Sequence, residues 1–204
     1  MPRCTFALER PHPDPVAGVD EAGRGPLAGP VVAAAVILDR GRHPRGMNDS
    51  KLLCPERRRD LAGELRLRAR VGVGIASVEE IDTINIYWAT MLAMTRAVDA
   101  LCATGPCEPA MVLVDGNRLP RWRYAAKAIV DGDALCLSIA AASIVAKHER
   151  DEMMRAADAE HPGYGWASNK GYGTRDHRDA LARLGPSPLH RRSFAPVAQL
   201  CTEM

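Results

Sequence analysis

The sequence lacks three features that would each point to a particular class of protein: paired cysteines, long apolar runs and a large net charge. Its six cysteines form no Cys-x-x-Cys pair and stand close to no histidine. Zinc sites and redox motifs need such spacing, so we expect neither. In a chain of this length, scattered cysteines indicate free thiols in a reducing compartment.

No segment approaches the roughly 18 uninterrupted apolar residues of a membrane span, and the first residues lack the apolar core of a signal peptide. These absences predict a cytoplasmic protein. The net charge is only +2, so the case for a nucleic-acid partner must rest on local patches of charge. With 204 residues, 47% of them hydrophobic, the chain is long enough for one large domain with a sizeable core.

What the sequence does contain is a stretch in which two apolar runs flank a polar break. Val16–Val19 and Val31–Leu38 have the composition of strands, and the break between them begins with Asp20 and Glu21. Neighbours in a regular strand face opposite sides of a sheet, so both acids can serve one site only if the strand stops or bulges there. Taken alone, this pattern is more typical of a solvated hairpin turn.

The same break holds two glycines around an arginine. Gly23 and Gly25 can adopt positive φ and let another backbone approach closely. Arg24 between them carries a planar head with five donors, which suits phosphate oxygens.

The rest of the chain alternates between strand and helix patterns. Strands are predicted at 70–76, 111–114 and 124–130, and helices at 55–66, 77–101, 135–154 and 175–184. Ser77 and Glu80 have the spacing of a capping box, and Thr174 is the expected N-cap of the last of these helices. Residues 1–15 are interrupted by prolines and indicate a loose lead-in.

Three of the predicted strands lead into acids: Asp20 with Glu21, then Asp115, then Asp131 or Asp133. Ends of neighbouring strands in an α/β sheet are adjacent in space, so these acids can converge on one edge. Carboxylates about 4 Å apart repel by roughly 4 kcal/mol at an effective dielectric of about 20, so such a cluster needs cations.

The ligand chemistry narrows the choice of cation. Oxygen ligands without convergent histidine or cysteine favour Mg²⁺ or Mn²⁺ over zinc. Two such ions about 4 Å apart can clamp the attacking and leaving oxygens of a phosphodiester. The residues alone therefore predict a metal-dependent enzyme that acts on phosphate esters.

Five motifs carry a resemblance to a known family. They are GVDEAGRGPLAGP at 18–30, DSK at 49–51, VDGN at 114–117, GD at 132–133 followed by SIAAASIVAK at 138–147, and NKGYGT at 169–174. In this order they resemble ribonuclease HII, the type 2 ribonuclease H family. The run SFAPV at 193–197 is similar to the family's ending.

The resemblance implies an α/β protein with a ribonuclease H-like fold: a central mixed five-stranded sheet flanked by helices, with a helical C-terminal part. We expect one domain, with its core at about 16–160 and a substrate-binding part at about 161–204. The implied activity is endonucleolytic cleavage of the RNA strand of RNA/DNA hybrids, and cleavage at single ribonucleotides in duplex DNA. The products would carry 3′-hydroxyl and 5′-phosphate ends.

The resemblance also assigns the acids. By position in the motifs, the family's catalytic metal ligands fall on Asp20, Glu21, Asp115 and Asp133, with up to two Mg²⁺ or Mn²⁺ ions. Asp131 stands where the family more usually has a neutral or basic residue, and could be a neighbouring acid, a solvated bystander or the true ligand. We expect Asp133 to be the ligand, because it keeps the family's distance to the SIAAAS helix.

Substrate contacts follow from the same motifs. Gly23, Arg24 and Gly25 match the family's GRG element, which contacts the ribonucleotide around the scissile phosphate; backbone amides there can sense a 2′-hydroxyl. Tyr172 matches the tyrosine that packs on the sugar at the RNA–DNA junction. A core tyrosine beside a turn is the alternative, and Tyr164 is the nearest competitor for the role.

Basic residues are candidates for phosphate contacts that position a duplex without reading its sequence. They are Lys51, Lys147, Lys170, Arg175, Arg191 and Arg192. For any one of them a solvated basic face is an equal alternative, and Lys147 could simply extend from an apolar helix to solvent. Ser138 and Ser143 are interpreted as helix-packing serines, and His177 is given no catalytic role.

Two other functions remain open at this point. A polynucleotidyl transferase of the same general fold, such as a junction resolvase, would cut branched DNA and ignore a 2′-hydroxyl. A nucleic-acid-binding module that has lost catalysis would bind without cleaving, although the intact set of acids argues against it. We expect a monomer, with RNA/DNA hybrids and ribonucleotide-containing duplex DNA as partners.

Overall fold

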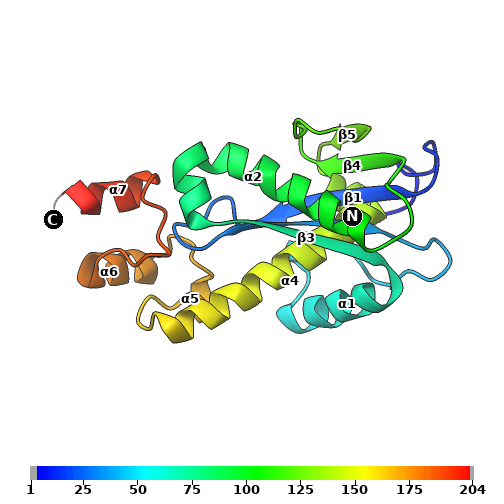
Figure 1. Cartoon of the computed structure of the whole chain (residues 1–204). Helices are drawn as coiled ribbons and strands as arrows, with labels where there is room; N and C mark the ends of the chain where they lie inside the picture. Colours follow the sequence, from blue (N-terminus) through cyan, green and yellow to red (C-terminus); the bar gives the residue numbers. More distant parts are fainter. Residues whose placement is uncertain (1–3, 203–204) are drawn as a thin grey trace.

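The computed structural model, which describes residues 4–202, contains one mixed sheet of five strands with helices on both faces (Figure 1). The strands are β1 Val16–Ala22, β2 Val31–Ile37, β3 Arg70–Ala76, β4 Met111–Asp115 and β5 Ala126–Ile129, in the spatial order β3-β2-β1-β4-β5. Strands β1, β2 and β3 pair antiparallel, whereas β4 pairs parallel with both β1 and β5. The predicted fold class is confirmed.

Some helices cover the faces of this sheet, and the last three lie beyond it (Figure 1). They are α1 Pro55–Arg68, α2 Val78–Ala103, α3 Gly132–Leu135, α4 Leu137–Glu160, α5 Trp166–Asn169, α6 Arg175–Leu184 and α7 Ala195–Thr202, with a 3₁₀ turn at Ser50–Leu52. Helix α2 covers one face of the sheet, and α1 and α4 cover the other (Figure 1). None of the helices within residues 4–202 is long and apolar enough to cross a bilayer.

Small side chains bring these layers close to the central strands. Strand β2 reads VVAAAVI and is buried on both faces, so its alternate residues pack under α2 and under α4. At Gly18 of β1, a Cβ atom would lie 2.1 Å from the carbonyl carbon of Ser138, so only glycine allows α4 to sit this near. The approach places the start of α4 directly against the strand that carries the first two acids.

The long helix α2 begins as its sequence predicts. Ser77 accepts a hydrogen bond from the Glu80 amide at 3.2 Å, and the Glu80 carboxylate accepts one from the Ser77 amide at 2.9 Å, which completes the capping box. The helix is interrupted at Asn85, which has φ 65° and ψ 164°. Its side chain accepts from the amides of Tyr87 and Trp88 and so caps the second part of the helix.

One expectation about the chain ends is wrong. The lead-in is not loose: Thr5 forms a bridge with Cys136, and buried Glu9 accepts hydrogen bonds from the amide and hydroxyl of Ser138 at 3.1 and 3.0 Å. The chain after α6 pairs with the loop between β1 and β2 through the bridge between Ala28 and His190, and it then forms α7.

Candidate active site

Strand β1 carries Asp20 and Glu21 without stopping or bulging, which corrects the first expectation about this site. The strand pairs regularly with β2 through Ala22, so the two acids lie on opposite faces of the sheet. Asp20 lines a pocket on the α4 side together with Ser143. Glu21 also lines a second pocket, on the α2 side, together with Tyr87 and Met91.

The two acids still line one site because β1 extends beyond the end of its parallel partner, β4. Pairing between β1 and β4 ends at Val19 and Val114, so the next residues, Asp20 and Asp115, lie side by side at an open end of the sheet. Asp20, Glu21 and Asp115 all line a pocket of about 230 Å³. Glu21 and Asp115 also line the second pocket, of about 270 Å³. We call the first of these the acid pocket.

The fourth acid does not end a strand. Strand β5 stops at Ile129, and Asp133 lies in the short helix α3 that follows. Asp133 is buried, with Oδ2 3.4 Å from Lys51 Nζ, whereas Asp131 is exposed in a left-handed conformation (φ 53°) at the start of α3. The structure thus turns Asp133 toward the other acids and Asp131 away from them.

The acids repel one another where they meet. Burial raises the pKa of Asp20 well above its usual value, and the charges of Glu21 and Asp115 raise it further. Burial, followed by the charge of Asp133, raises the pKa of Asp115. Burial also raises the pKa of Glu21, with Arg24 acting against it. A divalent cation would relieve this repulsion, and an all-oxygen donor set suits Mg²⁺ or Mn²⁺.

Each carboxylate is held by another group of the chain. Among residues 4–202, no three histidine, cysteine, aspartate or glutamate side chains lie in an arrangement that could hold a metal ion as they stand. The partners are the Glu21 amide for Asp20 at 2.7 Å, Arg24 for Glu21 at 3.2 Å, the Gly132 amide for Asp115 at 2.7 Å and Lys51 for Asp133 at 3.4 Å. The donors fit the cations chemically, and here each carboxylate is engaged by a group of the chain itself.

The glycine turn and Tyr172 both line the acid pocket. Gly23 has φ +98°, as expected, but Gly25 has no positive φ, which corrects that prediction. A Cβ atom on Gly25 would lie 3.9 Å from the Tyr172 ring, so its absence leaves space beside the ring. Tyr164 is a core residue whose hydroxyl donates to the Gly185 carbonyl at 2.8 Å.

Five of the six basic candidates divide into three groups. Lys51 and Lys147 line the acid pocket, with Lys147 Nζ 5.8 Å from the centre of the Tyr172 ring. Lys170 does not line it, and its ammonium donates to the Ala167 carbonyl. Arg175 and Arg192 are exposed on the C-terminal segment, away from the pocket.

Arg191 corrects the sequence-based prediction, because it is fully buried and unavailable to a phosphate. Its guanidinium donates to backbone carbonyls of the loop that contains Gly23 and Arg24. Buried Arg150 does the same from helix α4, and the sequence carries no sign of it beyond one more charge in a helix.

Ser143 has more than a packing role. Its hydroxyl lies 2.8 Å from that of Ser50, and both line the acid pocket. The DSK motif is thereby attached to α4 beside Asp20. Ser138 and His177 are buried outside the acid pocket, where Ser138 binds Glu9.

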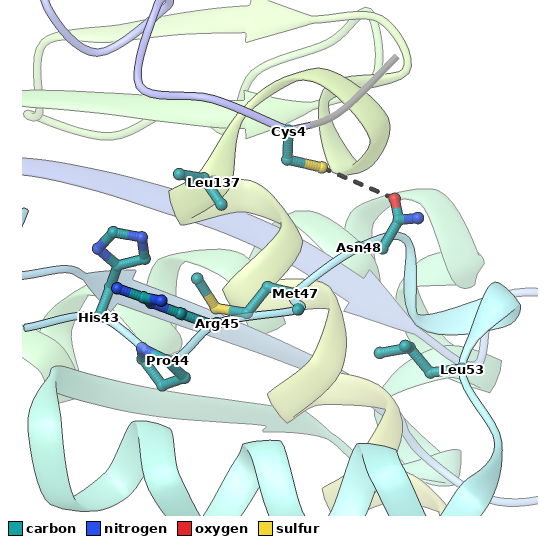
Figure 2. A pocket seen from close by; sticks show the side chains of 9 residues that line it. Cys4, His43, Pro44, Arg45, Met47, Asn48, Leu53 and Leu137 are labelled. Carbon is teal, nitrogen blue, oxygen red and sulfur yellow. Dashed lines mark hydrogen bonds between the residues drawn. The ribbon is translucent and has the colours of Figure 1, made fainter. Parts of the chain in front are cut away.

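A third pocket, of about 530 Å³ (Figure 2), shares no lining residue with the acid pocket. Asn48 lines this pocket, while Ser50 and Lys51 line the acid pocket. Figure 2 shows Cys4 pointing toward Asn48, with Sγ and Oδ1 3.9 Å apart. No carboxylate within the described residues lines this pocket, so the expected chemistry belongs to the smaller one.

A mixed five-stranded sheet between helical layers, with carboxylates at the open end of its central strands, defines a nuclease with a ribonuclease H-like fold. Residues 17–197 match the ribonuclease HII family, and the chain belongs to that family. The resemblance of its motifs is confirmed. So is the endoribonuclease activity on RNA/DNA hybrids that this membership implies.

Relatives and solved structures agree with this assignment. Ribonuclease HII of Rhizorhabdus wittichii is 72% identical over 195 residues, covering 96% of this chain and 95% of the relative. That of Sphingopyxis alaskensis is 63% identical over 185 residues, or 91% of each chain. The ribonuclease H2 structure from Pyrococcus horikoshii has a TM-score of 0.73 at 26% identity, covering 92% of this chain and 97% of the other.

The fold extends to a more distant relative. The structure of Bst ribonuclease HIII in complex with Mn²⁺ has a TM-score of 0.75 at 20% identity, and the match covers 92% of this chain and 69% of that one. At this identity the likeness shows the shared fold alone.

Proposed function

We propose that this chain cuts the RNA strand of RNA/DNA hybrids and also cuts at single ribonucleotides in duplex DNA, leaving 3′-hydroxyl and 5′-phosphate ends. Asp20, Glu21, Asp115 and Asp133 hold up to two Mg²⁺ or Mn²⁺ ions. The observation that carries the proposal is that three of these acids, the GRG turn and Tyr172 line one pocket.

The acids divide the work by position. Asp20 and Asp115 lie side by side at the end of β1 and β4, and Glu21 reaches them from the opposite face of the sheet. When bound, the cations supply a Lewis acid that activates water and stabilises the departing 3′-oxygen. Asp133 completes the donor set from α3, and its charge already acts on Asp115.

The walls of the pocket hold the substrate. The GRG turn offers backbone amides to the ribose and phosphate, and the Tyr172 ring packs on the next sugar, where its bulk rejects a further 2′-hydroxyl. Lys51 and Lys147 supply positive charge at the pocket, and Lys170 adds to it from outside. Such phosphate contacts position the duplex without reading its sequence.

Residues 161–204 form the part that binds the duplex beyond the cut, and residues 203 and 204 of this range lie outside the described residues. Exposed Arg175 and Arg192 in this part suit backbone phosphates. The chain acts as a monomer on its nucleic-acid substrate. A ribonuclease HII from Archaeoglobus fulgidus has been solved in complex with PCNA (TM-score 0.70, 27% identity, 87% of this chain and 93% of that one).

The test is cleavage of matched duplexes that carry no ribonucleotide, one ribonucleotide or four, with Mg²⁺, with Mn²⁺ or with EDTA. We expect metal-dependent cleavage of the second and third duplexes only, and loss of activity in Asp20→Asn. Asp131→Asn is the matched control, because Asp131 is exposed and asparagine tolerates its left-handed backbone.

Three outcomes would contradict the proposal. Wild-type turnover by Asp20→Asn would refute the metal assignment. Cleavage of branched all-DNA substrates with no preference for a ribonucleotide would favour a resolvase. Duplex binding that is insensitive to EDTA, without cleavage, would favour a binding module.

A further inference from the structure

Arg191 is a buried cation that is held by backbone carbonyls. It is fully buried, and it forms no ion pair with any residue in the range 4–202. Its Nη2 donates to the Gly23 carbonyl at 2.5 Å, its Nη1 to the Arg24 carbonyl at 2.9 Å and its Nε to the Gly29 carbonyl at 2.9 Å. Removing a charge from water is costly, so these carbonyl dipoles replace the lost hydration.

These contacts set the direction of two amides. A trans peptide is planar, so the N–H of the following residue points opposite to each carbonyl. Because Arg191 donates to the carbonyls of Gly23 and Arg24, both carbonyls face it, and the amides of Arg24 and Gly25 point away from it. Neither amide donates a hydrogen bond to another residue that the structure describes. The turn they belong to lines the acid pocket.

We propose that Arg191 is a positioning residue that fixes the Arg24 and Gly25 amides toward the substrate and thereby sets the preference for a ribonucleotide. The inference rests on the function proposed above and assigns its selectivity to a residue that touches no substrate. Two outward amides in succession can contact a 2′-hydroxyl and the adjacent phosphate, both of which accept hydrogen bonds.

The C-terminal segment delivers Arg191 to this place. The Arg191 amide donates to the Leu27 carbonyl at 2.8 Å, and the Gly29 amide donates to the Leu189 carbonyl at 2.9 Å. The backbone of Arg191 is therefore hydrogen-bonded to the same loop as its side chain. A lysine could not replace it, because an ammonium group lacks the planar fork that spans several carbonyls at once.

Arg150 offers a matched control within the same cluster. It is equally buried, and it donates to the carbonyls of Ala28, Pro30 and Lys170 at 3.0 to 3.1 Å. It makes no hydrogen bond to the carbonyls of Gly23 or Arg24. The Arg150 side chain packs on Gly23, where a Cβ atom would lie 2.0 Å from Arg150 Nε. Arg150→Lys therefore removes contacts from the same loop but leaves in place the Arg191 hydrogen bonds that set the direction of the two amides.

The experiment compares affinities for two duplexes that differ by one 2′-hydroxyl. Arg191→Lys, Arg191→Gln and Arg150→Lys are each placed in the non-cleaving Asp20→Asn background, and the Kd is measured with Mg²⁺. We expect tighter binding of the ribonucleotide duplex in the Asp20→Asn protein and with Arg150→Lys. Both Arg191 variants should bind the two duplexes equally, with the Kd for all-DNA duplex unchanged.

Cleavage gives a second readout in the otherwise wild-type protein. The value of kcat/KM on the single-ribonucleotide duplex should fall by about 100-fold in the Arg191 variants, as expected for a displacement of about 1 Å at a reacting group. A folded Arg191 variant that keeps the ratio of the two Kd values measured for the Asp20→Asn protein would overturn the inference. So would equal loss of that ratio in Arg150→Lys, or equal affinities in the Asp20→Asn protein itself.

A measurement without any Arg191 variant covers the case in which both fail to fold. In the Asp20→Asn protein, the ribonucleotide duplex should shift the NMR signals of the Arg24 and Gly25 amides, and the all-DNA duplex should not. The amide of exposed Gly63 in α1 serves as reference. Unshifted Arg24 and Gly25 signals overturn the inference. Failure of the proposed function shows separately, as absence of cleavage by the wild-type protein.

Discussion

The Nε2 atoms of His177 and His190 lie 3.1 Å apart in the core of the C-terminal segment. Trp166 donates its indole N–H to His177 Nε2 at 3.0 Å, so the proton of His177 lies on Nδ1, 2.9 Å from the Tyr172 carbonyl. The Ser187 amide donates to His190 Nδ1 at 3.0 Å, so His190 donates from Nε2. Both rings are neutral, and together they tie the backbone of Tyr172 to a buried core.

This pair predicts a loss of stability in acid. Burial, with a contribution from His177, lowers the pKa of His190 to about 4 from its usual 6.5. Between these two pKa values the unfolded chain binds more protons than the native one. The free energy of unfolding therefore increases as pH rises through this range and decreases as pH falls. The contribution of His190 should fall by about 2 kcal/mol between about pH 7 and about pH 5.

Urea unfolding at the two pH values measures this contribution. His190→Gln should be less stable at neutral pH and should lose this part of the pH dependence. His43→Gln, on the distant loop before the DSK motif, should keep the wild-type dependence. An unchanged pH slope in His190→Gln would show that the titration of His190 is not its source.

The acids predict a second effect, on stability without metal. Asp20 is buried beside Glu21 and Asp115, which disfavours its charged form. Asp20→Asn removes that repulsion, so in EDTA its unfolding free energy should rise by about 1 kcal/mol, a shift of roughly 2–4 °C in Tm. Adding Mn²⁺ should raise the Tm of the wild-type protein and of Asp131→Asn, and much less that of Asp20→Asn. Equal Mn²⁺ shifts in all three proteins would contradict this reading.

Local patterns were sufficient to predict much of the fold. The apolar runs of β1 and β2 and the capping box of α2 are determined by residues near one another in sequence, and the structure contains all three. The motif order placed the acids that meet at the end of the sheet. The prediction failed where the outcome depends on a distant partner: β1 continues past Asp20 because β2 offers Ala33 and Ala34 as pairing residues.

The carboxylates of the site could be predicted from the sequence, but the residues that hold the surrounding loops in place could not. Arg191 has the charge of a phosphate contact. Nothing in the neighbouring sequence shows that it donates a hydrogen bond to the Gly29 carbonyl, 162 positions away. Glu9 and Ser138, 129 positions apart, are a similar case. A charge pattern does not report burial, because burial is decided by segments that meet only in the folded chain.

The close approach of α4 to the sheet predicts a sharp difference between two glycines. At Gly18, a Cβ atom would lie 2.1 Å from the Ser138 carbonyl carbon and 2.3 Å from the Ile139 amide nitrogen. Gly18→Ala therefore forces β1 and α4 apart, and we expect a loss of about 3 kcal/mol or a failure to fold. Gly63, exposed in α1, has no atom within 4 Å of a Cβ, so Gly63→Ala should stabilise by about 0.5–1 kcal/mol. Thermal unfolding of both variants measures the contrast, and an equal effect at the two positions would refute it.

Tyr172 predicts a change in substrate choice. Tyr172 is 44% exposed and lines the acid pocket beside Gly25, so its ring is free to pack on a sugar. An aromatic contact to a nucleotide contributes about 1–3 kcal/mol, so Tyr172→Ala should lower kcat/KM by roughly 10- to 100-fold on the single-ribonucleotide duplex. The loss should be smaller on the four-ribonucleotide duplex, because the missing ring no longer rejects a second 2′-hydroxyl.

Tyr172→Phe keeps the ring and should retain the wild-type preference. Tyr164→Phe, which removes only a hydrogen bond in the core, should lower Tm and leave the preference intact. Equal losses in Tyr172→Phe and Tyr172→Ala would mean that the hydroxyl, and not the bulk of the ring, reads the junction.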